Sequence, residues 1–174
     1  MSAPSRPHPG DVIVAADAAG TALFVATAVL AATTFTTTTQ WIGAITAMSL
    51  FVIGVVVFLW AFYNAVQRSR TEQVSVTQLF LLLGDAVPSR VRRIMLTLVV
   101  VQFGTALATT LARPNGPDGS PGSSLAVGFL VTMFGLGLNG LWAAYHGRFA
   151  PRQDLDAVAV PESSRRRDKN EDHG

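Results

Sequence analysis

The sequence contains no cysteine and few charged residues. Without cysteine, the chain cannot form disulfide bonds, thiolate nucleophiles, iron–sulfur clusters or zinc ribbons. Charged residues make up 14% of the chain, against about 25% in typical soluble domains. They are absent from three long stretches, residues 18–67, 94–112 and 119–147. This distribution predicts a polytopic membrane protein rather than a soluble fold.

Four stretches are long and apolar enough to cross a bilayer, whose core of about 30 Å requires about 20 helical residues. The predicted spans are about 15–35, 41–66, 94–112 and 124–146. The first span is rich in alanine and threonine and is the least hydrophobic. We therefore predict an all-α membrane protein, with an antiparallel four-helix transmembrane bundle over residues 12–147.

The connections between the spans differ in character. TTTTQ, residues 36–40, predicts a tight helical hairpin in which threonine hydroxyls bond back to main-chain carbonyls. RPNGPDGSPGSS, residues 113–124, predicts a solvated loop without structure of its own. The tails, residues 1–11 and 148–174, are expected to be disordered cytoplasmic segments, the second of them basic.

The connection between the second and third spans contains VSVTQLFLLLG, residues 74–84. This segment is too short to cross the membrane and too apolar to float free. Its helical spacing predicts a short interfacial helix that Gly84 stops. The apolar positions with this spacing are Val76, Leu79, Phe80 and Leu83.

The basic residues indicate an orientation. Twelve of the thirteen fall on the side that would hold both termini, and only Arg113 falls on the other side. The positive-inside rule therefore predicts a multi-pass protein of the cytoplasmic (inner) membrane with both termini in the cytoplasm. An impermeant thiol reagent outside should then label Ser120→Cys and leave Ser163→Cys unlabelled. We expect the arginines to contact anionic lipid headgroups, and we expect no nucleic-acid partner.

Aromatic residues near the span ends are expected to anchor the bundle at the two membrane interfaces. Those at the predicted cytoplasmic interface are Trp60, Tyr63, Trp142 and Tyr145, and Trp41 lies at the outer one.

Small residues recur every three or four positions in the fourth span. FGLGLNG fits the letters of a dinucleotide-binding GxGxxG motif, but that motif requires a strand before it and a helix after it. Inside an apolar helix, we interpret the small residues instead as a face that another helix approaches closely. This face comprises Ser124, Gly128, Thr132, Gly135, Asn139 and Ala143, and the second span carries a weaker version in Gly43, Ala47, Gly54, Ala61 and Ala65.

Two amides, Gln102 and Asn139, are the polar side chains deepest in the third and fourth spans. Buried amides need partners, so they are expected either to form interhelical hydrogen bonds or to line a polar solute path.

Asp17 is the one carboxylate expected below the headgroups. It could stabilise the start of its helix through the macrodipole. Alternatively, it could form a cytoplasmic-end cluster that relays protons or binds an anionic headgroup. The residues expected at that end are Asn64, Gln67, Arg68, Arg92, His146 and Arg148.

Catalytic and metal-binding patterns are missing. His8 and His173 lie in the tails, and His146 stands alone at an interface. Neither HExxH nor GxSxG occurs, and no metal-ligand spacing is present. We therefore predict no catalytic residue, no metal and no cofactor, and a protein that is not an enzyme.

Two motifs, FYNAVQRSRTEQV and FGLGLNGLWAAYHGRFAPR, resemble a family of uncharacterised actinobacterial membrane proteins with four predicted spans. The resemblance covers about residues 11–152. It departs at Tyr145, where the family pattern has arginine, and at Ala150, where it has proline. It implies four spans in an actinobacterial cytoplasmic membrane and implies no activity.

The leading functional hypothesis is an accessory or scaffold subunit of a larger membrane complex, bound to other membrane subunits or to itself. The alternative is a small oligomeric transporter or channel in which Asp17, Gln102 and Asn139 line the path. A third hypothesis, a lipid-modifying enzyme, would need His146 or Asp17 as acid or base.

Overall fold

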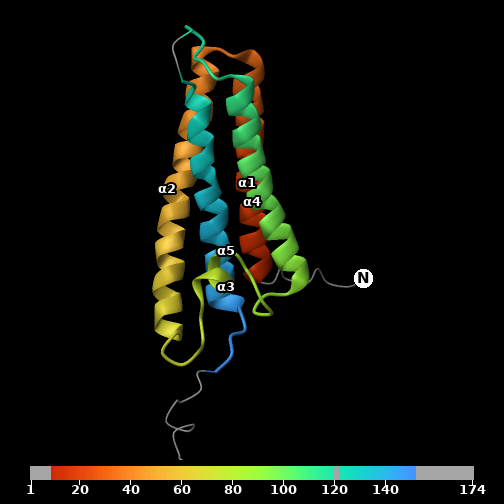
Figure 1. Ribbon diagram of the computed structural model, residues 1–174, viewed down its shortest axis with the longest axis vertical. Coiled ribbons are helices and arrows are strands. Elements are labelled where there is room, and N and C mark those ends of the chain that lie inside the picture. Colours follow the sequence, from red (N-terminus) through yellow and green to blue (C-terminus); the bar gives the residue numbers. More distant parts are fainter. Residues whose placement is uncertain (1–8, 120–121, 152–174) are drawn as a thin grey trace, which may run out of the picture.

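The computed structural model describes residues 9–119 and 122–151 (Figure 1). The element order is α1 (Pro9–Thr34), α2 (Thr37–Arg68), α3 (Val76–Phe80), α4 (Ser89–Ala112), the 3-10 helix η1 (Ser124–Val131) and α5 (Thr132–His146). No strand occurs in these ranges, where Glu72 and Pro151 form an isolated bridge.

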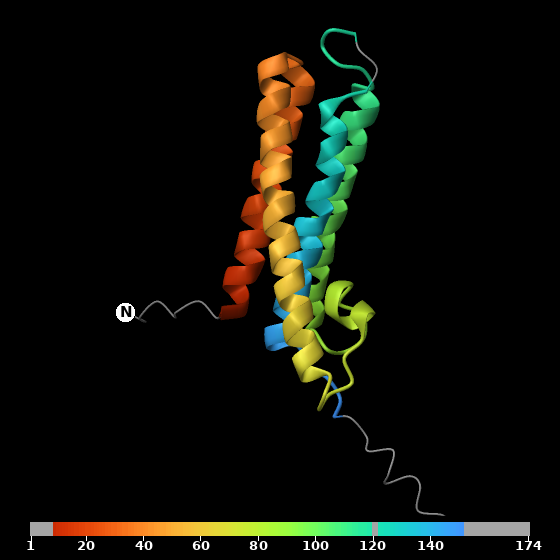
Figure 2. The ribbon, with the colours of Figure 1, turned by 90° about the vertical axis from the view of Figure 1, so that its left-hand side faces the viewer.

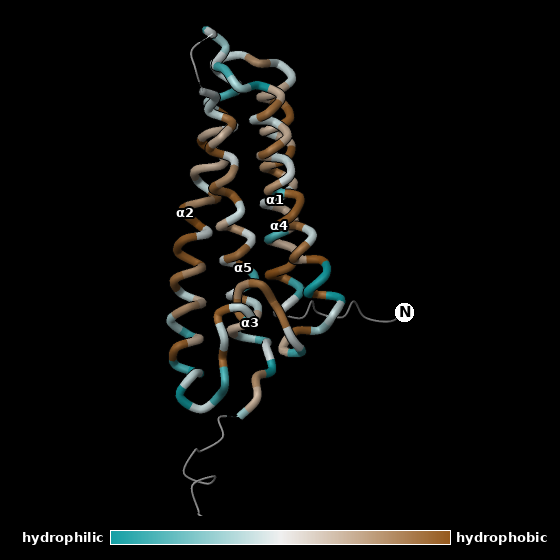
Figure 3. Tube along the Cα trace, viewed as in Figure 1, coloured by the Kyte–Doolittle hydropathy of each residue, from teal (hydrophilic) through white to brown (hydrophobic). Residues whose placement is uncertain are grey.

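Four helical segments are long and apolar enough to cross a membrane, which makes this a multi-pass membrane protein. They are Gly10–Thr34, Thr37–Arg68, Ser89–Ala112 and Ser124–His146. The long helices lie side by side along the long axis of the molecule (Figures 1 and 2). Hydrophobic residues follow their lengths, and hydrophilic residues gather where the chain turns (Figure 3).

Three of the helices extend beyond the predicted spans. Pro9 begins α1 six residues before the predicted start of that span, and Ser89 begins α4 five residues before position 94. The predicted start of the third span was too late because the prediction placed its boundary at Arg92 and Arg93. A helix continues into the polar interface, where charged side chains such as Arg92 remain in reach of water.

The hairpin between α1 and α2 is tighter than predicted. Thr36 caps α2, because its Oγ1 accepts from the Thr39 amide at 3.3 Å while the Thr39 hydroxyl accepts from the Thr36 amide at 3.2 Å. Most of TTTTQ is therefore the first turn of α2, and the chain reverses at Phe35 (φ 48°) and Thr36. The hydroxyl of Thr39 donates to the carbonyl of Thr36 at 3.0 Å, which confirms the predicted back-bonding within TTTTQ.

The fourth span, η1 and α5, is the most buried of the four. Half of its most apolar stretch is buried, against 22% to 28% for the other spans. Figures 1 and 2 show it running among α1, α2 and α4. The membrane domain is therefore organised around its last span.

Small residues allow α2 and α5 to approach closely. A Cβ on Gly137 would lie 2.5 Å from the carbonyl oxygen of Gly54, and a Cβ on Gly54 would lie 2.5 Å from the amide nitrogen of Phe134. The predicted small-residue face of α2 is confirmed, because all five of its members are buried: Gly43, Ala47, Gly54, Ala61 and Ala65.

The other face of the fourth span meets α1 and α4. A Cβ on Gly128 would lie 3.0 Å from Cζ of Phe24 and 3.4 Å from Cβ of Ala106. A Cβ on Gly135 would lie 2.8 Å from Cγ2 of Val99. Gly128 and Gly135 are therefore helix-packing positions, as predicted.

The short helix α3 packs on α5. Its Leu79 and Phe80 are buried, and Phe80 stacks on Phe58 with ring centroids 4.0 Å apart. A Cβ on Gly140 would lie 2.4 Å from Phe80, so this glycine makes the notch that the ring fills. The prediction that the helix continues to Gly84 was wrong, since it ends at Phe80 and the chain then turns through positive φ at Leu82 and Gly84.

Several predicted loop and tail boundaries need correction. Residues 9–11 belong to α1 rather than to a disordered tail. The amide of Arg148 donates to the carbonyl of Ala86 at 2.9 Å, and the amide of Gln73 donates to the carbonyl of Ala150 at 2.8 Å. Residues 148–151 are thus tied to the connection around α3. The rest of both predicted tails, residues 1–8 and 152–174, lies outside the described residues, as do Ser120 and Ser163.

The loop that begins at Arg113 is attached to the α1–α2 hairpin. Nε of Arg113 donates to the carbonyl of Ala32 at 3.0 Å, and the guanidinium lies 4.4 Å from the centre of the Phe35 ring. The loop was predicted to have no structure of its own, but its first residue is attached to the α1–α2 hairpin.

The prediction that Trp142 anchors the protein at a membrane interface was wrong. Trp142 is only 6% exposed and lies inside the protein, whereas the side chains of Trp41, Trp60, Tyr63 and Tyr145 are exposed. The indole of Trp142 is covered by the start of α1, where a Cβ on Gly10 would lie 2.9 Å from its Nε1.

Candidate functional site

Asp17 lies deep in the protein rather than at a helix start. Because α1 begins at Pro9, Asp17 is in the third turn, beyond the part of the helix where the macrodipole acts. Its side chain is fully buried. The helix-start prediction was therefore wrong.

Gln102 of α4 connects to two residues of α1. Its Nε2 donates to Oδ1 of Asp17 at 3.3 Å and to Oγ1 of Thr21 at 2.7 Å. Thr21 follows Asp17 by one helical turn, so both face α4. All three side chains are buried, with exposed fractions of 0% to 3%. We call Asp17, Thr21 and Gln102 the Asp17 cluster.

The partners found for Asp17 replace the expected cytoplasmic-end cluster. Instead of a group at the helix ends, the partner of Asp17 is Gln102 in the middle of α4. The sequence analysis missed Thr21. Its i, i+4 spacing from Asp17 was the signal that could have identified it.

Two oxygens of the Asp17 cluster have no hydrogen-bond partner within the described part of the chain. They are Oδ2 of Asp17 and Oε1 of Gln102. Gly135 of α5 lies against this amide, because a Cβ there would be 2.7 Å from Oε1 of Gln102. The glycine therefore leaves the space in which the Gln102 carbonyl oxygen lies.

Asn139 belongs to a separate polar contact. Its Nδ2 donates to the carbonyl of Phe80 at 3.1 Å, and its Oδ1 has no partner among the described residues. Since Phe80 ends α3, the amide satisfies a carbonyl that the short helix leaves free. Gln102 and Asn139 both bridge elements, as predicted, but they bridge different pairs.

His146 ends α5 beside Trp142, with ring centroids 5.3 Å apart. Its Nδ1 has no hydrogen-bond partner in the described ranges. A Cβ on Gly10 would lie 3.6 Å from its Cδ2, so the imidazole contacts the start of α1. The side-chain hydrogen bonds of Asp17 and Asn139 are to Gln102 and Phe80, not to this histidine.

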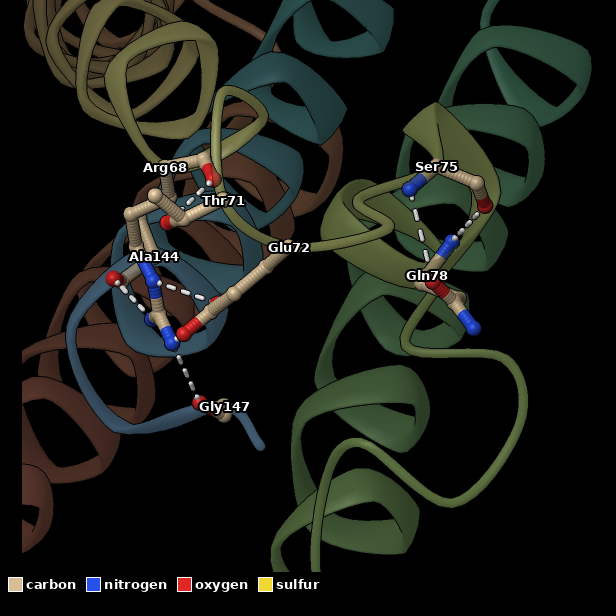
Figure 4. A network of polar contacts seen from close by, with 7 residues as sticks. All are labelled: Arg68, Thr71, Glu72, Ser75, Gln78, Ala144 and Gly147. Carbon is tan, nitrogen blue, oxygen red and sulfur yellow. Dashed lines mark hydrogen bonds and ion pairs between the residues drawn. The ribbon is translucent and has the colours of Figure 1, made fainter. Parts of the chain in front are cut away.

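Arg68, at the end of α2, binds the carboxyl end of α5 (Figure 4). Nη1 donates to the carbonyl of Ala144 at 2.7 Å, and Nη2 donates to the carbonyl of Gly147 at 3.1 Å. Nη2 also lies 2.7 Å from Oε2 of Glu72, and the guanidinium lies 5.0 Å from the Phe149 ring. Arg68 thus caps α5, whose last carbonyls carry partial negative charge.

An apolar groove is lined by side chains of α1, α2 and α5. Its volume is about 650 Å³. Nε1 of Trp60 donates to the hydroxyl of Tyr145 at 2.9 Å, and this bond forms its polar rim. The lining side chains are Ile13, Val56, Val57, Leu59, Trp60, Tyr63, Leu141 and Tyr145. We call this surface the α1–α2 groove.

Among residues 9–119 and 122–151, no group of three His, Asp or Glu side chains lies close enough to hold a metal ion. The chemistry available is therefore that of hydrogen-bonded amides, one buried carboxyl and an apolar groove.

Comparison of the chain with protein-family models, with curated proteins and with solved structures gives no match.

Proposed function

We propose that this protein is a non-enzymatic accessory or scaffold subunit of a larger membrane complex. In this proposal, the long helices form an antiparallel transmembrane bundle in the cytoplasmic membrane, with both termini in the cytoplasm and α3 at the interface. The arginines at that end contact anionic headgroups. The observation that carries the proposal is the α1–α2 groove.

The shape of the groove favours a transmembrane helix of a partner subunit. Lipid tails are as apolar as the side chains of a helix, so association in the membrane depends on shape fit and on hydrogen bonds. Leu141 of α5 lines the groove together with side chains of α1 and α2, so three helices contribute to the surface. The hydroxyl of Tyr145 at the rim offers a polar contact to a partner helix.

The buried polar groups support a structural role for the bundle. Gln102 joins α4 to α1, Asn139 joins α5 to α3, and Arg68 joins α2 to α5. These hydrogen bonds join separate elements, and the bond of Arg68 joins α2 to α5, both of which line the groove.

Purification from the native membrane in mild detergent tests the proposal. We expect a stable heteromeric assembly, and we expect Val56→Trp in the groove to release the partner. Ile45→Trp is the matched control, because Ile45 is also exposed on α2 but does not line the groove. A monomer that transports a solute by itself would contradict the proposal, as would equal effects of the two variants.

The second candidate is a small oligomeric transporter or channel. The buried carboxyl of Asp17 favours it, because intramembrane carboxylates often mark ion pathways. Asn139 contributes less to this candidate than the sequence suggested, since it bonds to Phe80 rather than to the Asp17 cluster. An ion or solute flux into liposomes that Asp17→Asn abolishes would support transport over the accessory role.

A further inference from the structure

We propose that the Asp17 cluster binds one monovalent cation, a proton or Na⁺. The inference rests on the cluster alone and does not depend on the accessory-subunit proposal. Its basis is the arrangement of donors and acceptors around a carboxyl that is fully buried in a membrane-spanning helix.

The cluster has more acceptors than donors. The amide nitrogen of Gln102 donates hydrogen bonds to Oδ1 of Asp17 and to Oγ1 of Thr21. Oδ2 of Asp17 and Oε1 of Gln102 remain without a donor from the described residues. A buried acceptor without a partner is costly, so an added positive group at Oδ2 of Asp17 would satisfy an oxygen that the described residues leave unpaired.

No basic side chain on the packed elements supplies that charge. The titratable and charged groups of these helices lie near the ends: Asp11 on α1, Tyr63 and Arg68 on α2, Arg90, Arg92 and Arg93 on α4, and Tyr145 and His146 on α5. Along α4, Arg92 is separated from Gln102 by about 15 Å. An ionised Asp17 would therefore be a buried charge without a counter-charge, which is strongly unfavourable.

The oxygens fit a small hard cation. Carboxylate, amide carbonyl and hydroxyl oxygens are the ligands that such cations prefer. Asp17, Gln102 and Thr21 supply one of each kind from two helices. A single carboxylate neutralises a charge of one, which favours a monovalent over a divalent ion in a site enclosed by apolar helices.

Gly135 adds a steric condition. A Cβ at this position would lie 2.7 Å from Oε1 of Gln102, closer than van der Waals contact permits. Any side chain there would displace the carbonyl oxygen that the proposal assigns to the cation. The glycine therefore preserves the geometry of the site as well as the packing of the helices.

Thermal unfolding of the full chain in lipid nanodiscs tests the inference. The wild type and Asp17→Asn are melted from acidic to alkaline pH in choline chloride, and again with equimolar NaCl. Because the variant lacks the carboxyl, its Tm corrects for all other titrating groups.

If a proton is bound, the wild-type Tm should fall relative to the variant by about 3 °C or more as pH rises, and NaCl should not restore it. If Na⁺ is bound, NaCl should restore it. A difference in Tm that responds to neither pH nor NaCl overturns the proposal.

A second measurement needs only the wild type and covers the case in which Asp17→Asn does not fold. Dicyclohexylcarbodiimide reacts with protonated carboxyl groups in apolar surroundings, and mass spectrometry locates the adduct. We expect Asp17 to be labelled at acidic pH and protected at alkaline pH, and Na⁺ binding would add protection by NaCl. Exposed Asp85 is the matched control, for which we expect no labelling. Absent labelling of Asp17, or labelling that neither pH nor NaCl changes, contradicts the proposal.

Discussion

Single glycines decide how closely the fourth span approaches its neighbours. Gly135 and Gly104 are both within spans, but their surroundings are opposite. A Cβ at Gly135 would meet Gln102 at 2.7 Å, whereas a Cβ at Gly104 would meet nothing within 4 Å. The pair therefore separates the effect of packing from the effect of helix propensity.

We expect Gly135→Ala to lower the free energy of unfolding by about 1–3 kcal/mol, because the new methyl group overpacks a tight contact. Gly104→Ala should be neutral or should raise it by up to about 1 kcal/mol, because alanine favours the helix. Denaturant titration in mixed micelles would measure both values. Equal effects would show that the close approach at Gly135 does not exist.

The coupling between Gln102 and Thr21 is a second property at this scale. Gln102→Leu should destabilise the protein by about 1–3 kcal/mol, because it leaves buried acceptors without their donor. In a double-mutant cycle with Thr21→Val, the two effects should be less than additive, since both variants remove the same 2.7 Å bond. Strict additivity would contradict that bond.

At the scale of elements, one arginine secures the ends of two helices. Arg68 has donors to three oxygen atoms, on Glu72, Ala144 and Gly147, and a planar guanidinium matches this arrangement better than an ammonium group does. The sequence pointed to Arg68 as one basic residue of the expected cytoplasmic end and as a candidate neighbour of Asp17. The structure gives it a specific role as the cap of α5.

We expect Arg68→Lys to destabilise the protein by about 1–2 kcal/mol and to increase hydrogen exchange at the carboxyl end of α5. The matched control is Arg70→Lys, because Arg70 is exposed two residues further along the chain. If exchange near Gly147 were the same in both variants, the capping role would be wrong.

At the scale of the whole molecule, the basic residues predict an orientation of the helices in the membrane that can be tested with exposed positions. The chain has no native cysteine, so each introduced thiol is unique. Gln67 at the end of α2 and Asn115 after α4 are both exposed. They lie in segments at opposite ends of the molecule (Figure 1).

An impermeant maleimide added to intact cells should label Asn115→Cys and leave Gln67→Cys unlabelled until the membrane is opened. The positive-inside rule gives this direction. Labelling of Gln67→Cys from outside would reverse the proposed orientation.

The sequence by itself determined the features that are local along the chain. Long uncharged stretches determined the membrane class and the four spans, and residues three or four apart determined the buried small-residue face of α2. Threonine back-bonding in TTTTQ was equally predictable. These features depend on helix geometry and on the cost of burying charge, and both act within a few residues.

The tertiary structure alone decided which residues meet across elements. Gln102 binds Asp17 and Thr21 rather than Asn139, Phe80 enters the notch at Gly140, and Trp142 is covered by the start of α1. Such pairings depend on the rotation and axial position of each helix relative to the others. Close packing of the whole set of side chains fixes both quantities, so no single segment of the sequence carries them.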